Sequence, residues 1–581
     1  MASSNAEAAA RVWPALTASA LLGFALGVLF PAWHVAIEPA QVAAGLVTYP
    51  PDNPFALYET RVWNLWHQLL APILAAGVPE RTLTFAVSGA VGAITFVSMS
   101  CFASAMGASA PLAIAAPLLT WFFNPMVMRW GFNYPILLVG YGHTYGMVGI
   151  AWLALACGAL GLGHLATGAF LIGLGPALHA SLGAWLALLA GVCGLTMFGR
   201  LRPQLGTILR GGLAGVAVAG ASLALHEIGR APAPSIDPAV AQRYLDTFVH
   251  LWDAHRGAPE IEWNLSLLLV STALGISLAL RRGGELGVGA ALALRIFAAA
   301  ALLGVSLGAL LYLVPPRDIP NMLLIAMPTR MLNFPVLVYV PLVLGVLWRH
   351  RGDPIARVTL AVFAVAAVLW PHANWLQTVC VPGAGVVAIA LVWRGERARK
   401  IPNADALIAA VTVLAIGVGV VQMATNAIEK FPVRAARIRD RSTDPALEAA
   451  SRTTGLLAVA PSVSTAQAIT RRPLVIDPMA LDMLPYALAG APQVERILAD
   501  LYGIEYFNPP GSALRQGVVP YGMAKKIWES RAQVGWVATA SRVGFTHVLV
   551  PMNWHIDLPL VAKSDVYALY RVPEAGPSGS Q

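Results

Sequence analysis

One long stretch of the sequence, from Leu83 to His226, contains no aspartate or glutamate. A water-soluble fold of that length needs acidic side chains on its surface, and about 25% of the residues of an average soluble protein are charged. Here only 12% of the 581 residues are charged, 57% are hydrophobic, and the mean hydropathy is +0.67. The composition therefore predicts a multi-spanning membrane protein and argues against a cytosolic enzyme.

Apolar runs that approach the roughly 20 residues of a membrane-crossing helix occur about thirteen times. The first lacks a convincing cleavage site, so we interpret it as an uncleaved span and not as a signal peptide. The fold class is predicted as an all-α polytopic membrane bundle with a small C-terminal α/β domain on the outer face. The candidate spans lie near residues 12–33, 83–106, 109–124, 146–163, 165–180, 182–198, 209–227, 263–280, 287–314, 333–348, 357–371, 375–393 and 405–426.

The loops between these segments predict an orientation. The most basic short loops are 200–210, 281–282, 349–357 and 394–400, and the positive-inside rule assigns them to the cytoplasm. We therefore expect a bacterial inner-membrane protein with a cytoplasmic N-terminus and an extracytoplasmic C-terminal region. Because the positive charge is sorted in this way, the net charge of +9 is read as a topology signal, and no nucleic-acid partner is expected. The opposite loops contain the acids Glu38, Asp52, Glu59, Glu227, Asp237, Asp246, Asp253, Glu260 and Glu262.

Composition divides the chain into a bundle over residues 1–429, with outer loops 34–82 and 228–262, and a domain over 430–573. In the second part, alternating apolar residues predict short strands, and periods of 3.6 residues predict helices. The last residues, 574–581, are expected to be a disordered tail. The predicted strands are 455–460, 473–477, 545–550 and 566–572, and the predicted helical stretches are 493–502 and 522–542.

The first outer loop is the densest region of candidate chemistry. Three prolines stiffen the backbone around Asp52, and a general base that deprotonates an acceptor hydroxyl needs such positioning. Glu59 is the second candidate carboxylate, Glu38 is held in reserve, and Arg61 is a candidate substrate-binding residue. In the alternative reading, Asp52-Asn53-Pro54 is only a turn that Asp52 caps.

Two further outer connections supply candidate binding residues. His143 lies among glycines and tyrosines and is predicted to line a polar pocket, although an interfacial aromatic belt explains the same pattern. Arg317 and Arg330 lie in a later connection, and guanidinium groups suit phosphate oxygens. The alternative for both arginines is that they snorkel to the membrane interface.

Other polar residues carry weaker signals. His250, Asp253 and His255 include an i, i+3 pair, but without a third ligand on one face a solvated amphipathic helix is favoured over a metal site. Asp477 at a predicted strand end is read as a loop or cap residue ahead of a site residue. The four cysteines lie inside apolar runs with no CxxC pair, so neither a disulfide framework nor a zinc site is predicted.

This layout resembles the GT-C class of membrane glycosyltransferases, which includes protein mannosyltransferases and oligosaccharyltransferases. The resemblance rests on the first outer loop with its carboxylates, about a dozen spans, late outer-loop arginines and the C-terminal α/β domain. It implies a polyprenyl-phosphate-linked sugar donor and an acidic residue of the first outer loop as base or metal ligand, which places Asp52 first and Glu59 second. The loop lacks the Asp-x-Asp or Glu-x-Asp pair usual in that class, so no metal ligand is assigned and a divalent metal cofactor stays open.

The sequence thus predicts a sugar transferase in contact with membrane lipids, acting on an extracytoplasmic glycan, lipid or protein. Three alternatives stay open: a lipid or polysaccharide carrier, a polysaccharide polymerase or ligase, and a non-catalytic assembly subunit. The carrier predicts tolerance of Asp52 substitution, whereas the transferase predicts that Asp52→Asn abolishes transfer. Every acid lies in a loop or at the end of a predicted span, which counts against ion coupling, because ion-coupled carriers keep ionisable groups near the midplane.

Overall fold

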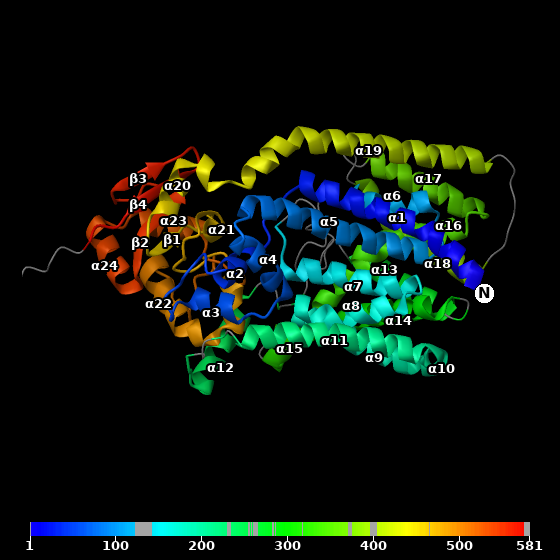
Figure 1. Cartoon of the computed structure of the whole chain (residues 1–581), viewed down its shortest axis with the longest axis horizontal. Coiled ribbons are helices and arrows are strands. Elements are labelled where there is room, and N and C mark those ends of the chain that lie inside the picture. Colours follow the sequence, from blue (N-terminus) through cyan, green and yellow to red (C-terminus); the bar gives the residue numbers. More distant parts are fainter. Residues whose placement is uncertain are drawn as a thin grey trace, which may run out of the picture.

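A computed structural model of the chain has two parts that lie end to end along its longest axis (Figure 1). One part is a bundle of helices, and the other is a small domain of helices and strands formed by the C-terminal residues. The helix α19 runs along one side of the bundle and leads into the second part, while the N-terminus lies at the far end of the bundle. The structure describes residues 2–122, 142–228, 230, 234–253, 256, 258, 265–281, 284, 286–315, 318–369, 375–395, 404–463 and 465–574.

A helix occupies each of the apolar segments that the sequence assigns to a span. This agreement follows from the local nature of the signal, because a run of apolar residues without breakers satisfies its own backbone groups as a helix. Short helices α10 (Phe198–Leu201) and α15 (Asn321–Ile325) lie in the connections. The long helices are α1 (Ala2–Leu29), α5 (Glu80–Ala105), α6 (Ala110–Phe122), α7 (Tyr145–Gly161), α8 (Leu165–Leu178), α9 (Ala180–Thr196), α11 (Leu205–Ile228), α13 (Leu265–Arg281), α14 (Val288–Leu313), α16 (Asn333–Arg349), α17 (Pro354–Leu369), α18 (Trp375–Arg394) and α19 (Ala404–Arg437).

Within the described residues, five helical segments are long and apolar enough to cross a membrane. Eight shorter apolar helices of 10–17 residues accompany them. These segments support a membrane protein, while the span count of about thirteen and the orientation stay predictions. The five are Val12–Leu29, Glu80–Ala105, Phe198–Ile228, Val288–Leu313 and Asn321–Arg349.

The helices of the bundle pack closely wherever glycines face a neighbouring backbone. A Cβ atom at Gly27 of α1 would come within 2.1 Å of the carbonyl oxygen of Ser88 on α5. A Cβ atom at Gly215 of α11 would come within 2.2 Å of the carbonyl oxygen of Phe170 on α8. Small residues that let backbones approach are the usual basis of helix association in lipid.

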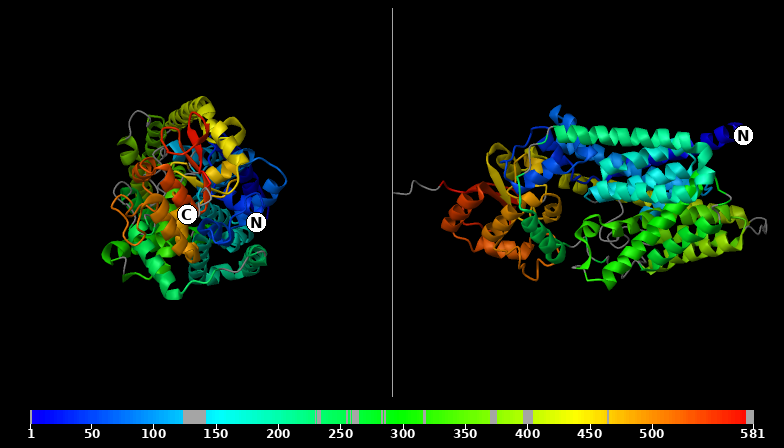
Figure 2. Two further views of the ribbon diagram at one scale, coloured as in Figure 1. Left: turned by 90° about the vertical axis from the view of Figure 1, so that its left-hand side faces the viewer. Right: turned by 90° about the horizontal axis from the view of Figure 1, so that it is seen from below.

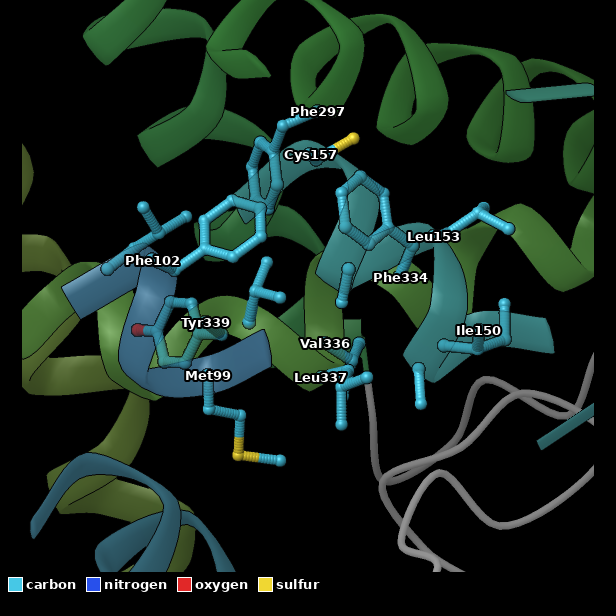
Figure 3. Packing of buried hydrophobic residues seen from close by; sticks show 14 of the residues in the cluster. Met99, Phe102, Ile150, Leu153, Cys157, Phe297, Phe334, Val336, Leu337 and Tyr339 are labelled. Atoms are coloured by element: carbon cyan, nitrogen blue, oxygen red, sulfur yellow. The ribbon is translucent and has the colours of Figure 1, made fainter. Parts of the chain in front are cut away.

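Helix α16 lies at the centre of the bundle, and its side chains are almost all buried. Figure 3 shows Phe334 of α16 beside Phe102 of α5 and Phe297 of α14. The Phe334 ring centroid lies 6.0 Å from that of Phe102 and 5.8 Å from that of Phe297. This packing joins three helices that are distant in the sequence.

The C-terminal domain is built on a four-stranded sheet with the order β1-β2-β4-β3. The β1 and β2 strands are parallel, whereas β2 with β4 and β4 with β3 are antiparallel. Trp528, Trp536 and Trp554 are fully buried in its core. Its elements are α20 (Pro445–Arg452), β1 (Leu456–Val459), α21 (Ala466–Thr470), α22 (Ala491–Tyr502), α23 (Tyr521–Glu529), α24 (Gln533–Val543), β2 (Phe545–Pro551), β3 (Leu560–Lys563) and β4 (Tyr567–Arg571).

Several details of this domain differ from the sequence prediction, which also lacked the short helices α20 and α21. The segment 473–477 forms only an isolated bridge between Leu474 and Leu457, and the edge strand β3 was not predicted. The stretch 522–542 is two helices, α23 and α24, separated at residues 530–532. The expected tail begins at Glu574, and its residues 575–581 lie outside the described residues.

The two predicted outer loops contain short helices at the end of the bundle that faces the C-terminal domain. Loop 34–82 forms α2 (Ile37–Ala43), α3 (Pro54–Arg61) and α4 (Leu65–Ala75), and loop 228–262 forms α12 (Pro238–Thr247), followed by a wide turn to Trp252. Figures 1 and 2 show α2 and α3 lying between the bundle and the domain. The interface between the two parts is therefore made largely by loop residues.

Candidate functional site

The helix α3 carries Glu59 into this interface. Asn53 begins the helix, because its side-chain oxygen accepts hydrogen bonds from the backbone N–H groups of Phe55 and Ala56 at 2.9 and 3.0 Å. The amide of the same side chain donates to the carbonyl oxygens of Leu474 and Val475 in the C-terminal domain. One residue thus starts the helix and fixes it against the domain.

The short helix α21 of the C-terminal domain meets loop one from the other side. Gln467 is fully buried, and its Nε2 donates to Glu59 Oε2 at 3.1 Å and to the Glu38 carbonyl oxygen at 3.1 Å. Its Oε1 accepts a hydrogen bond from the Tyr49 hydroxyl. Thr465 and Arg471, which flank α21, both have the left-handed φ values of 65° and 55° that non-glycine residues rarely adopt. Such strain persists where the surrounding structure fixes it, as it often does at functional sites.

Three carboxyl groups gather here, and we name Glu38, Glu59 and Asp477 the carboxylate cluster. Glu59 is only 4% exposed, and its buried Oε1 has no hydrogen-bond partner among the residues that the structure describes. Burial and then the charge of Glu38 raise the pKa of Glu59 well above its usual range. Burial and then Asp477 raise the pKa of Glu38 to about 8, and burial raises the pKa of Asp477 to about 6.

A second group of polar rings adjoins the cluster, and we name Trp33, His34, Trp66, His143 and Tyr145 the histidine–tryptophan cluster. The backbones of His34 and His143 pair as a short parallel bridge, and their rings lie 6.0 Å apart. His34 Nδ1 accepts a hydrogen bond from the Ala36 N–H at 2.9 Å, which leaves the proton of the neutral ring on Nε2. That Nε2 is buried, and among the described residues it has no hydrogen-bond partner; the same holds for the indole nitrogens of Trp33 and Trp66.

The histidine–tryptophan cluster is rich in hydrogen-bond donors, and its His34 is held neutral. Burial, followed by the neighbouring His143 and His67, lowers the pKa of His34 well below its usual value. Tyr145 shares a 2.5 Å hydrogen bond with His67 Nε2 and lies within electrostatic range of Glu59 and Glu38. The two clusters are therefore parts of one site.

On its other side the site leads to a small cavity lined mainly by leucines of α14 and α15. Arg256 borders this cavity, pairs with Asp253 and donates to the Tyr486 hydroxyl at 3.2 Å. The Tyr486 ring lies 6.3 Å from that of Tyr58, the residue that precedes Glu59. A path of adjacent side chains thus connects the apolar cavity to the carboxylate cluster.

The candidate site residues named from the sequence lie in different surroundings in the structure. Asp52 is exposed, whereas Glu59 is buried in the interface. Arg61 ends α3 and is half-buried, and His143 is fully buried in the histidine–tryptophan cluster. Arg330 lies in the turn Pro328–Leu332, close to His179. Arg317 lies outside the described residues.

The weaker sequence signals have different outcomes. Asp477 caps a turn by accepting a hydrogen bond from the Met479 N–H at 2.8 Å, and it also belongs to the carboxylate cluster. Asp253 pairs with Arg256, and His255 lies outside the described residues. Within the residues that the structure describes, no group of three or more His, Cys, Asp or Glu side chains is arranged to hold a metal ion.

Sequence reasoning missed Gln467 and Arg256. Gln467 lies 408 residues beyond Glu59 in the chain, and no local pattern marks a buried amide as a site residue. No family model matches the chain, and no curated protein or solved structure matches it at a significant level. The function is therefore argued from the site itself.

Proposed function

We propose that the chain is a membrane glycosyltransferase that moves a sugar from a polyprenyl-phosphate donor to an extracytoplasmic acceptor. The observation that carries the proposal is the path of adjacent side chains, Arg256, Tyr486 and Tyr58, that connects a small apolar cavity to the buried carboxylate cluster. A lipid-linked sugar has the matching chemistry, because its apolar chain, its phosphate and its polar sugar follow one another in that order. Arg330, which follows the cavity-lining Thr329, supplies positive charge for the phosphate.

In this proposal Glu59 is the general base. Its Oε1 takes the proton of the acceptor hydroxyl while the hydroxyl oxygen forms a bond to the anomeric carbon of the sugar. The bond between that carbon and the phosphate oxygen breaks, and polyprenyl phosphate leaves with the electron pair, so the anomeric configuration inverts. A carboxylate whose pKa is raised toward the working pH is a stronger base, which favours proton transfer.

The histidine–tryptophan cluster is suited to bind the sugar. Its buried Nε2–H of His34 and the indole N–H groups of Trp33 and Trp66 are donors for hydroxyl and ring oxygens. The aromatic rings offer flat apolar faces beside those donors. Neutral donors bind an uncharged ring without the cost of burying another charge.

The test uses the full-length protein in lipid nanodiscs with a panel of polyprenyl-phosphate sugars and cell-envelope acceptors. We expect release of polyprenyl phosphate and a loss of about 100-fold or more in Glu59→Gln, the usual effect of removing a general base. Asp52→Asn is the matched comparison in the same loop, and we expect it to retain activity because Asp52 is exposed.

Full activity of Glu59→Gln together with loss in Asp52→Asn would return the role of base to Asp52. A protein that releases no polyprenyl phosphate from any donor, but moves labelled lipid between leaflets, would be a carrier and would exclude the transferase.

A further inference from the structure

The wall of the small apolar cavity contains a buried hydrogen-bond donor. Arg256 lines the cavity together with leucines of α14 and α15, and its side chain is only 2% exposed. Its two terminal nitrogens bind Asp253 and the Tyr486 hydroxyl, whereas its Nε–H has no hydrogen-bond partner in the described part of the chain. A buried donor without a partner costs free energy, so its position in a cavity wall points to an acceptor that binds there.

The second outer loop fixes Arg256 from two sides. Trp252, four residues earlier, is fully buried in the core of the C-terminal domain, and its Nε1 donates to the Tyr506 carbonyl oxygen at 2.9 Å. Toward the bundle, Leu245 of the same loop shares a buried apolar cluster with Leu324, which also lines the cavity. The loop thus connects the domain to the cavity wall and holds the Nε–H in place.

The wall formed by the connection after α14 is strained. Met327 lines the cavity, is only 3% exposed and has a left-handed φ of 44°. A bulky residue rarely adopts this conformation, which persists where surrounding contacts fix it, often at ligand sites. Trp185 of α9 supplies one such contact, because its indole N–H donates to the adjoining Ala326 carbonyl oxygen at 3.1 Å. Strain and an unsatisfied donor therefore occur in the same cavity.

We infer that this cavity selects the lipid carrier by binding only the part of the prenyl chain next to the phosphate, with Arg256 as the residue that fixes its position. This inference rests on the proposed function, because it names the recognised part of the proposed donor. The space in the cavity is at most about 250 Å³, whereas pockets that enclose a drug-sized ligand measure about 300–1,000 Å³. The rest of a long chain therefore lies outside the cavity and does not contribute to selection.

Arg256 acts where the hydrocarbon ends. Its Nε–H donates to a phosphate oxygen, while the leucine side chains contact the chain. The buried pair with Asp253 has no net charge, so this hydrogen bond fixes position more than it adds attraction. Tyr486 contacts Arg256 on the side away from the cavity, and the Tyr58 ring, 6.3 Å from that of Tyr486, precedes Glu59. A sugar on the phosphate thus extends toward the base.

A phospholipid fits this site less well than a prenyl phosphate. Glycerol and ester groups separate the chains of a phospholipid from its phosphate, whereas a prenyl chain is bonded directly to a phosphate oxygen. Thr329 lines the cavity and Arg330 follows it, so the positive charge for the phosphate lies one residue from the apolar wall. That spacing suits a phosphate at the very end of the chain.

The experiment measures lipid binding to the full-length protein in nanodiscs, by competition with a labelled long-chain polyprenyl phosphate. The competitors are farnesyl phosphate, which has three isoprene units, the unlabelled long-chain polyprenyl phosphate, and lysophosphatidic acid as the glycerol-based comparison. Affinities are expressed as mole fractions in the bilayer. We expect the two prenyl phosphates to bind within about tenfold of each other, and both to bind at least tenfold more tightly than lysophosphatidic acid.

Two variants and one matched control test the residues. Leu310→Phe fills the cavity and should weaken binding of both prenyl phosphates at least tenfold. Leu313→Phe, at an 81% exposed position of the same helix, should bind as the unaltered protein does. Arg256→Lys keeps a positive charge for Asp253 but has no Nε–H, and it should weaken binding at least fivefold. Unfolding temperatures measured alongside show that each variant is folded.

An affinity that rises more than tenfold from farnesyl phosphate to the long chain, equally tight binding of lysophosphatidic acid, or unchanged binding in both Leu310→Phe and Arg256→Lys would overturn the inference. Prenyl phosphate binding that meets these expectations without sugar transfer from any donor would reject the proposed function and leave the lipid site standing. Sugar transfer that neither variant alters would keep the proposed function and reject the lipid site.

Discussion

Two buried carboxylates, Glu80 and Glu59, lie at the same interface between the bundle and the C-terminal domain and are 5% and 4% exposed. Around Glu80 the charge is balanced, because Arg471, Arg441 and the Gln41 amide bind its two oxygens. Around Glu59, within the described residues, one hydrogen bond comes from Gln467, and the charges that act on Glu59 are those of other acids.

The contrast shows how one interface serves two purposes. Paired charges stabilise the attachment of the domain, since breaking a buried pair leaves an uncompensated charge. Unpaired acids raise one another's pKa and lower stability, which is the arrangement found where a group is needed for chemistry or binding. Changing either region alone tests whether the other depends on it.

The largest loss of stability is expected from Glu80→Ala. This change leaves Arg471 and Arg441 without their partner, and the expected loss is about 3 kcal/mol in the free energy of unfolding. Thermal unfolding in detergent and protease cleavage near residues 438–444 measure it. If Glu80→Ala unfolds at the same temperature as the unaltered chain, the paired region does not hold the domain.

The second-largest loss of stability is expected from Gln467→Leu, which removes three hydrogen bonds at once. Leaving buried partners unsatisfied costs about 1–3 kcal/mol. The Gln467 hydrogen bond also lowers the pKa of Glu59, so its loss should move the acid limb of the pH–activity curve to higher pH. A purely structural residue would lower stability without moving that limb, and Thr539→Val serves as a buried control outside the site.

A smaller change in stability is expected when the pH is raised. The folded state binds protons more tightly than the unfolded chain at Glu38, with its pKa of about 8, and at Asp477, with its pKa of about 6. Raising the pH from 5 to 8 removes those protons, so stability falls and the unfolding temperature drops by about 2–4 °C. The double variant Glu38→Gln with Asp477→Asn should flatten this dependence, and a profile that rises over the same range would contradict it.

The smallest effect is expected on the stability of Glu59→Gln. Removing an acid from among acids relieves repulsion and keeps the hydrogen bond to Gln467, so unfolding should be unchanged or slightly harder. The comparison with Glu80→Ala in one unfolding series separates the two regions. A destabilisation as large as that of Glu80→Ala would mean that Glu59 is also a structural residue.

Much of the architecture follows from local patterns of residues in the sequence. The acid-free run from Leu83 to His226 is helical over most of its described length, because apolar residues in succession form helices that need no distant partner. The turn at Asn53-Pro54 also follows from local chemistry, since asparagine caps a helix and proline suits its first position.

The site could be predicted only in part. The sequence singled out loop one, and within it Glu59, but ranked the proline-stiffened Asp52 first because proximity to prolines is a local signal. Burial is not a local property. Asp52 is exposed and Glu59 is buried because α3 presents one face to the C-terminal domain, where Gln467, the hydrogen-bond donor to Glu59, lies 408 residues later in the chain.

The sequence by itself therefore determined the helices, the membrane character and the loop in which to look. Only the tertiary structure decided which acids meet, because Glu38, Glu59 and Asp477 come from three segments that the packing of the domain against the bundle brings together. Electrostatic energies depend on distance and on exclusion of water, and neither exists until the chain has folded.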